Sequence, residues 1–171
     1  TVSLTQYSPE HHKHQTGLFW GFTRVNGSGL EKDSLNKWFY RKDKPAEIQA
    51  QIGRDFFHNP TGDYWQKVEA TILKASGDNL QWQTVYNLLN QDKKPILKET
   101  QTWTFSHKDN KHVLSLEWEA EAIEDITINE FDYGGLFLRM PWKAGVQGEA
   151  VNTARQINQK ADAQRAQWVD V

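Results

Sequence analysis

Apolar and polar residues alternate with a period of two through most of this chain, which is the pattern of β-strands that bury one face. The clearest alternating runs are residues 67–74 and 81–88, and the Ser-Gly-Asp-Asn segment at 76–79 between them has the composition of a tight turn. We therefore predict a hairpin. The side chains that the first strand should turn toward the interior are Val68, Ala70 and Ile72.

The alternation continues after this hairpin. Strands are predicted at residues 96–106 and 113–121, joined by a polar turn at 107–111, so that consecutive strands form a meander. Further strands are predicted at residues 16–26, 46–52, 123–131 and 136–140. An antiparallel sheet with one apolar face must bury that face against another layer. The pattern therefore predicts an all-β, antiparallel β-sandwich with little helix, formed as a single domain over residues 1–171.

Two stretches do not alternate. Residues 27–44 are rich in turn-forming and charged residues and are predicted to form a long ordered loop. Residues 151–161 have apolar side chains at roughly helical spacing but no continuous apolar stripe. Both a helix and a polar loop that leads into a strand near Trp168 remain open for this segment.

Composition narrows the classes of function. The 171 residues include 20 Lys and Arg against 22 Asp and Glu, with no basic stripe, which argues against nonspecific binding to nucleic acid. The absence of Cys rules out disulfides, a thiolate nucleophile and zinc sites built on thiolates. No apolar run reaches the roughly 18 residues of a membrane span. Eight Trp in this polar chain are unusual, and Trp103 and Trp118, which lie within clean alternation, are predicted core residues.

Two histidines near the start of the chain are the first candidates for chemistry. His12 and His14 project to the same side of an extended chain, where they could frame a polar substrate, ligate a metal together with Glu99, or simply face water. No cofactor is predicted.

Glu99 is a second anomaly, because its side chain shares a strand face with Trp103 and Phe105. A carboxylate among aromatic rings is costly unless it is paired or functional, and burial would suit it to acid–base catalysis near neutral pH. Two structural explanations remain open: the threonine-bearing face is the inner one, or Glu99 lies at a rim and pairs with Lys94 or Lys98.

Arg139 is the third anomaly, a guanidinium on the same strand face as Phe137. It could pair with Glu99 inside a cleft, or with Asp132 for structural reasons. The acidic residues between positions 117 and 125 are predicted to form a solvated strand face, because they lack the glycine and ligand spacing of a calcium loop.

Four motifs occur in order along the chain: His12-x-His14-x-x-Gly17-Leu18 with Val25-Asn26-Gly27; Gly134-Gly135-Leu136-Phe137-Leu138-Arg139; Asn152-Thr153; and Arg165-Ala166-Gln167-Trp168-Val169-Asp170. Together they resemble a large family of uncharacterised secreted bacterial proteins that is often labelled "methane oxygenase PmoA-like". The oxygenase of that label is a membrane protein, whereas this chain has no membrane span. Family members commonly carry a further His and an Arg where this chain has Gln15 and Thr16.

The resemblance implies a β-sandwich of the galactose-mutarotase-like type, in proteins exported to the periplasm or the extracellular space by bacteria that degrade polysaccharides. It also implies that the family's domain continues beyond the equivalent of Val171, so that a further segment or a second chain completes the sandwich.

Two functions follow as expectations. In the first, the protein is a carbohydrate-active hydrolase, lyase or epimerase whose catalytic residues His12, His14, Glu99 and Arg139 line a cleft on a sheet face. The predicted carbohydrate-binding residues are Trp20, Asn26, Trp142, Asn152, Arg165 and Trp168. In the second, the chain is a noncatalytic glycan-binding or structural assembly module.

Overall fold

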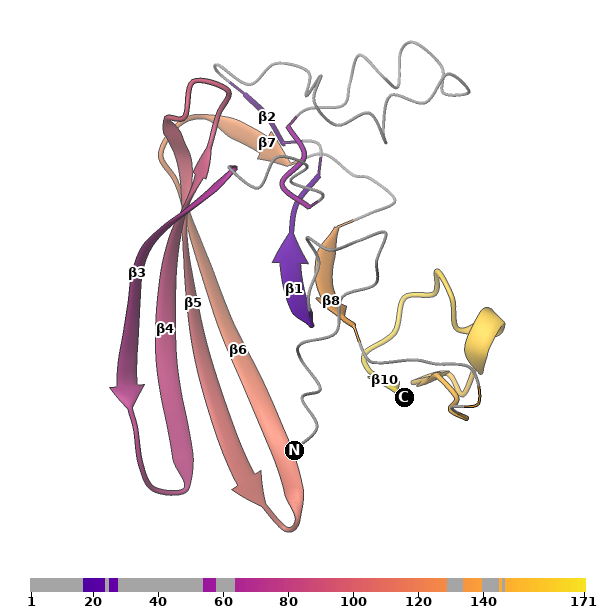
Figure 1. Cartoon of the computed structure of the whole chain (residues 1–171). Coiled ribbons are helices and arrows are strands. Elements are labelled where there is room, and N and C mark those ends of the chain that lie inside the picture. Colours follow the sequence, from indigo (N-terminus) through magenta and orange to yellow (C-terminus); the bar gives the residue numbers. More distant parts are fainter. Residues whose placement is uncertain are drawn as a thin grey trace, which may run out of the picture. The chain divides into compact units, whose positions relative to one another are not determined.

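The computed structural model describes residues 17–23, 25–27, 54–57, 64–128, 134–139, 145 and 147–171. Within these ranges the regular elements are antiparallel strands, apart from one short 3₁₀ helix, which confirms the predicted all-β class with little helix (Figure 1). The chain divides into two compact units, Thr1–Arg139 and Met140–Val171. The prediction of a single domain stays a prediction.

The first unit contains a four-stranded meander, as the alternation predicted. Its strands follow sequence order: β3 (Trp65–Lys74), β4 (Asn79–Leu89), β5 (Pro95–Lys108) and β6 (Lys111–Ala122). The turn between β5 and β6 consists of Asp109 and Asn110, both in the left-handed conformation, with φ of 50° and 58°. Two successive left-handed residues are typical of a type I′ turn, whose twist matches that of the strands it joins.

Two smaller strand pairs complete the first unit. β1 (Leu18–Gly21) pairs with β8 (Gly135–Leu138), and β2 (Val25–Gly27) pairs with β7 (Ile126–Ile128). The single strand predicted at 16–26 is therefore two strands, because the chain exchanges one partner for another between them.

The strand predicted at 123–131 begins later than expected, at Ile126, and its predicted end at 129–131 lies outside the described residues. The chain bends after β6, where the backbone N–H groups of Ile123 and Glu124 both donate to the carbonyl of Ile96. Strand pairing resumes only at β7. The strand predicted at 46–52 and the loop predicted at 27–44 lie outside the described residues.

The hydrophobic core of the first unit lies where β4 ends and β5 begins. Its cluster of buried residues is Val25, Phe56, Tyr64, Leu88, Ile96 and Leu97. Ile96 and Leu97 are adjacent on one strand and so point to opposite faces, yet both are buried. Both faces of the sheet are therefore covered at this end.

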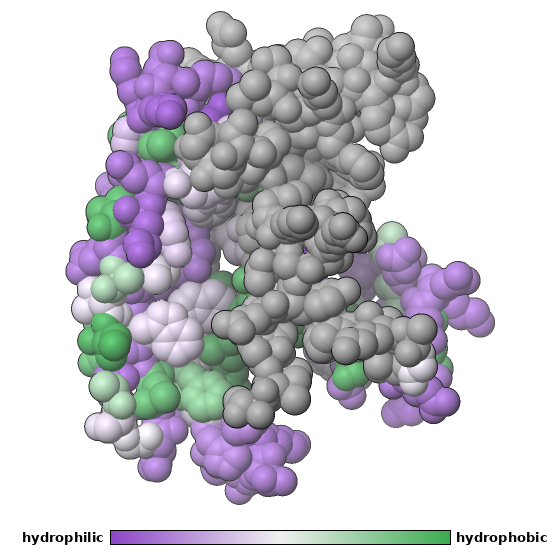
Figure 2. Space-filling view, in the orientation of Figure 1, coloured by the Kyte–Doolittle hydropathy of each residue, from purple (hydrophilic) through white to green (hydrophobic). Residues whose placement is uncertain are grey.

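The aliphatic side chains of β3 are exposed, so the burial predicted for them is wrong. Val68 is 56% exposed and Ile72 is 73% exposed. Pairing with β4 shifts register between Lys67 and Glu69 and again between Ile72 and Lys74, which breaks the regular alternation of faces. The strand is also at the edge of the four-stranded sheet. Hydrophobic and hydrophilic side chains accordingly alternate along the left-hand border of Figure 2, where Figure 1 places β3.

The second unit, Met140–Val171, has a different architecture. β9 (Val151–Asn152) pairs with β10 (Val169–Asp170), and a 3₁₀ helix spans Asn158–Lys160. The helical alternative for residues 151–161 is therefore wrong, and the polar loop leading to a strand beside Trp168 is confirmed. The left-handed backbone at Arg155 and Asn158, with φ of 60° and 51°, prevents a continuous α-helix.

Candidate functional site

Glu99 lies on a sheet face whose side chains come from three neighbouring strands. Cross-strand pairing places Tyr86, Glu99 and Ala120 in one row, and Thr84, Gln101 and Trp118 in the next. Trp82, Trp103 and Leu116 form the following row. We call this surface of β4, β5 and β6 the inner face.

The outer face of the same strands is polar. Gln81 and Gln83 donate side-chain hydrogen bonds to Thr104 and Thr102, at 3.1 and 2.9 Å. Its Glu117, Glu119 and Glu121 are exposed, as predicted for a solvated strand face. The possibility that the threonine-bearing face is the inner one is therefore wrong.

The Glu99 side chain is fully buried, with 0% of its surface exposed, so it does not lie at a rim. The side-chain amide of Gln101 donates a hydrogen bond to Oε1 of Glu99, and the indole N–H of Trp103 donates to the amide oxygen of Gln101 at 3.1 Å. The inner face thus carries a hydrogen-bonded chain that runs along β5 and ends at the carboxyl group.

Burial raises the pKa of the Glu99 carboxyl above its usual range, because the charged form loses its hydration. The hydrogen bond from Gln101 acts in the opposite direction, as does the indole of Trp118, although Trp118 Nε1 makes no hydrogen bond of normal geometry. Desolvation is the larger effect. The neutral carboxyl, which can donate a proton, is thus favoured over a wider pH range than in water.

Unsatisfied polar atoms gather around this carboxyl group. Oε2 of Glu99, Oγ1 of Thr84 and Nε1 of Trp118 are buried without a hydrogen-bond partner among the described residues, and so is Nε1 of Trp20. Buried polar groups in folded proteins are nearly always paired, because an unpaired one costs about 1–3 kcal/mol. A carboxyl oxygen, a hydroxyl and two indole N–H groups therefore have the chemistry to bind a hydroxyl-rich molecule.

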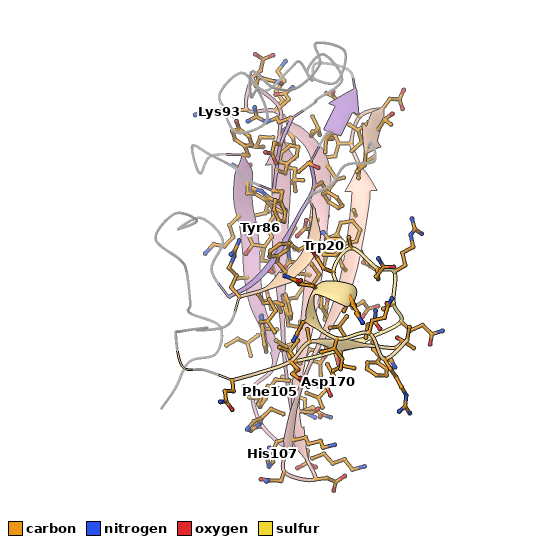
Figure 3. All side chains as sticks on the ribbon, turned by 90° about the vertical axis from the view of Figure 1, so that its right-hand side faces the viewer. Trp20, Tyr86, Lys93, Phe105, His107 and Asp170 are labelled. Carbon is orange, nitrogen blue, oxygen red and sulfur yellow. The ribbon has the colours of Figure 1, made fainter. Side chains whose placement is uncertain are left out.

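β1 brings Trp20 onto the inner face. The ring of Trp20 lies 5.3 Å from that of Trp118, and Phe22 contacts both rings at 5.7 and 5.4 Å between centroids. Figure 3 shows Trp20 and Tyr86 at a similar level along the strands. Trp118 is half-buried in this aromatic cluster. The packing of β1 against β6, which are far apart in the sequence, thus places a second indole ring against Trp118, in the row next to that of Glu99.

Two further indole rings lie beyond Gln101 on the same face. Trp82 and Trp103 are cross-strand partners with centroids 6.2 Å apart and planes that differ by 11°. Both are half-buried. Parallel indole surfaces of this kind can pack against the apolar faces of sugar rings.

Arg139 follows β8, and its backbone N–H donates to the carbonyl of Gly17 at 2.8 Å. Its guanidinium lies over the Phe137 ring, 5.3 Å from the centroid, so the predicted proximity of these two side chains is confirmed. Among the described residues, the hydrogen bond to Glu99 comes from Gln101 and not from Arg139. The predicted ion pair between Glu99 and Arg139 is therefore not formed in this structure.

Three of the remaining predicted site residues, His12, His14 and Trp142, lie outside the described residues. The backbone of Asn26 pairs with Thr127 in the β2–β7 pair. Their roles stay predictions.

In the second unit, Asn152 is 1% exposed and organises its own loop. Its Oδ1 accepts hydrogen bonds from the backbone N–H groups of Ala154 and Gln156, both at 3.0 Å, and its amide donates to the Gln156 side chain at 2.7 Å. Trp168 is 52% exposed, and Arg165 is exposed. Their predicted binding roles are untested. The contacts of Asn152 show a structural role.

Sequence reasoning missed two residues beside Glu99 on the inner face and a buried arginine elsewhere in the first unit. Thr84 and Gln101 are polar residues with no unusual feature in the sequence. Strand alternation nevertheless places Thr84 on the same face as Trp82, and Gln101 on the same face as Glu99. Arg54 was also missed: it is 5% exposed, and its guanidinium lies 3.5 Å from the centroid of the Tyr64 ring. Only the packing of distant segments reveals this cation–π contact.

No group of three or more His, Asp or Glu side chains among the described residues is arranged to hold a metal ion. No helix in the described part of the chain is long and apolar enough to cross a membrane.

The fold and the site define an all-β protein with a polar, aromatic-lined site on one sheet face. The chain belongs to DUF6807, a family of unknown function, whose model matches residues 1–171. Neither the comparison with curated proteins nor the comparison with solved structures gave a match.

Proposed function

We propose that this protein is a carbohydrate-active enzyme that binds a saccharide on the inner face and acts on it through acid–base chemistry at Glu99. The observation that carries the proposal is the cluster of unpaired buried polar atoms around the Glu99 carboxyl. Saccharide hydroxyls both donate and accept hydrogen bonds, so one of them can accept the proton that a neutral Glu99 carries on Oε2 and donate to the same oxygen once it is ionised, while others accept from the indole N–H groups of Trp20 and Trp118. The surrounding rings match the apolar faces of a pyranose.

Glu99 has the environment expected of a general acid. Its raised pKa keeps a proton on the carboxyl at higher pH than in water. In the proposed reaction that proton passes from the carboxyl to an oxygen of the saccharide, which leaves a carboxylate that the Gln101 amide stabilises by its hydrogen bond. The carboxylate regains a proton from the substrate or water as the cycle closes. This chemistry serves hydrolysis, elimination and epimerisation alike.

The remaining site residues and the location of the protein are part of the same proposal. His12, His14 and Arg139 would supply the partner base and a charged hydrogen-bond donor. The mutarotase-like sandwich and a periplasmic or extracellular location rest on the resemblance of the four motifs to a secreted family.

Complete burial of Glu99 has a consequence for binding. Because no part of its side chain is exposed, a saccharide can reach Oε2 only if neighbouring side chains move aside. Trp20 contacts Trp118 beside the carboxyl, so ligand entry should change the environment of at least one indole. Intrinsic tryptophan fluorescence is therefore a direct probe of the proposed site.

The test is to assay oligosaccharide mixtures with wild-type protein and with the variants Glu99→Gln and His14→Ala, following products by chromatography and NMR. Glu119→Gln on the outer face is the matched control, since its carboxylate is exposed. The proposal predicts that Glu99→Gln abolishes turnover and retains saccharide binding, whereas Glu119→Gln retains both. Unchanged turnover in both Glu99→Gln and His14→Ala would refute the assignment.

A noncatalytic glycan-binding module is the second candidate, and the parallel rings of Trp82 and Trp103 favour it. A binding module needs an aromatic surface and hydrogen-bonding groups but no proton transfer. In that case Trp82→Ala and Trp103→Ala would abolish retention on a polysaccharide column. Glu99→Gln would leave both this retention and the chemical structure of the ligand unchanged.

A further inference from the structure

A pair of imidazoles near the end of the four-stranded sheet stands apart from the Glu99 site. His107 and His112 are cross-strand partners on β5 and β6, separated from the turn by the pair Lys108 and Lys111. Their Nδ1 atoms lie 3.1 Å apart and their ring centroids 4.6 Å apart. Figure 3 shows His107 toward the lower end of the sheet, well away from Trp20.

We propose that His107 and His112 form a two-imidazole binding site for a divalent transition-metal ion such as Cu²⁺, Ni²⁺ or Zn²⁺. Imidazole nitrogen is a preferred ligand of these ions, and among them Cu²⁺ binds a given nitrogen site most tightly. The remaining coordination positions would be filled by water or by a second molecule. The inference is independent of the proposed carbohydrate function.

The spacing of the two Nδ1 atoms fits one shared ion. Two nitrogens bound to zinc at about 2.0–2.1 Å in a tetrahedron are about 3.3–3.4 Å apart, and neighbouring nitrogens of a square or octahedral site are about 2.8–3.0 Å apart. The observed 3.1 Å lies between these values. Without metal, one Nδ1 of the neutral pair must carry a proton toward the other. Binding requires only that this proton move to Nε2 of the same ring, which leaves both Nδ1 lone pairs for the ion.

The surroundings of the pair support a preformed site. The ring of His112 stacks on Phe105, with centroids 5.5 Å apart and planes that differ by 23°, which restricts its rotation. The tight turn at Asp109 and Asn110 fixes the register of the two strands. Both histidines are exposed, so an ion has direct access from solvent. The intervening lysines project from the opposite face by strand alternation.

The test uses Cu²⁺ with a full-length background variant in which the other four histidines, at positions 11, 12, 14 and 58, are replaced by Ala. This background is expected to bind one Cu²⁺, with electron paramagnetic resonance showing two coordinated nitrogens. His107→Ala or His112→Ala in the background should weaken binding by at least about tenfold, since one of two protein ligands is lost. Lys111→Ala is the matched control and should bind as the background does.

A second measurement covers the case in which the background variant does not fold. In the otherwise unchanged chain, replacing both His107 and His112 by Ala should lower the Cu²⁺ stoichiometry by one ion. It should also remove the part of the metal-induced increase in melting temperature that arises from linking β5 to β6. Equal stoichiometry and an equal shift in both proteins, or unchanged affinity of the single variants in the background, would overturn the proposal.

Discussion

The side-chain amide of Gln101 donates a hydrogen bond to the buried carboxyl group of Glu99, two residues away on the same face of β5. Gln101 is also the acceptor for the indole N–H of Trp103. One neutral amide therefore stabilises both a titratable group and an aromatic ring. Loss of this amide would leave the buried Glu99 carboxyl and the half-buried Trp103 indole N–H without their partners.

Replacing Gln101 by Leu should destabilise the protein by about 2–4 kcal/mol, because each unpaired buried group costs about 1–3 kcal/mol. Urea denaturation measures the change in the free energy of unfolding. Gln83→Leu is the matched control: Gln83 also makes a side-chain hydrogen bond, but to Thr102 on the neighbouring strand and on the outer face. If the two substitutions have equal cost, the chain of hydrogen bonds ending at Glu99 has no special role in stability.

The pH dependence of stability should report the raised pKa of Glu99. The folded protein holds the Glu99 proton more tightly than the unfolded chain does. The stability that this proton contributes is therefore fully present below the unfolded-state pKa and is lost as pH rises through the folded-state pKa. One proton gives a slope of at most about 1.4 kcal/mol per pH unit.

Urea denaturation of wild type and Glu99→Gln over a pH series would measure this effect. We expect the free energy of unfolding of wild type to fall relative to that of the variant as pH rises through the window between the two pKa values. Glu119→Gln, a substitution of the same kind at an exposed position, is the control. A difference between wild type and Glu99→Gln that is constant with pH would contradict the raised pKa.

The candidate site could be predicted from the sequence only in part. Strict alternation along β5 places Glu99 with Trp103 and Phe105, so the parity of the strand was enough to nominate the carboxyl group. The unpaired indole of Trp20 depends instead on the packing of β1 against β6, two strands that are far apart in the sequence. Local periodicity contains no information about such a contact.

The same distinction explains the fold. The hairpins were predictable because consecutive strands and polar turns are local signals, as in the segment from Asn79 to Ala122. The burial of β3 was not, since exposure of Ile72 depends on bulges and on the neighbours of an edge strand. The pairing of β2 with β7 was also not predictable, because closure of that long loop is decided by tertiary packing.

Asn152 offers a test of its structural role in the second unit. Asn152→Ala removes two acceptor contacts to backbone N–H groups and one donor contact to Gln156. Amide hydrogen exchange at Ala154 and Gln156 should accelerate by at least about tenfold, equivalent to about 1.4 kcal/mol or more of lost local stability. Asn152→Asp keeps the acceptor oxygens and should preserve most of the protection. Equal exchange in both variants would contradict a role based on these hydrogen bonds.

The turn between β5 and β6 should respond to backbone preference at Asn110, whose φ is 58°. Glycine adopts this conformation without steric cost, whereas a Cβ with no side-chain hydrogen bond costs roughly 1–2 kcal/mol there. We therefore expect Asn110→Gly to raise the free energy of unfolding by about 0.5 kcal/mol and Asn110→Ala to lower it by about 1 kcal/mol. Lys111→Ala, beside the turn but outside its left-handed pair, should change it little. Equal unfolding free energies for the Gly and Ala variants would show that the left-handed turn does not contribute to stability in solution.

Since the same turn aligns His107 with His112, Asn110→Ala should also weaken Cu²⁺ binding, whereas Asn110→Gly should retain it.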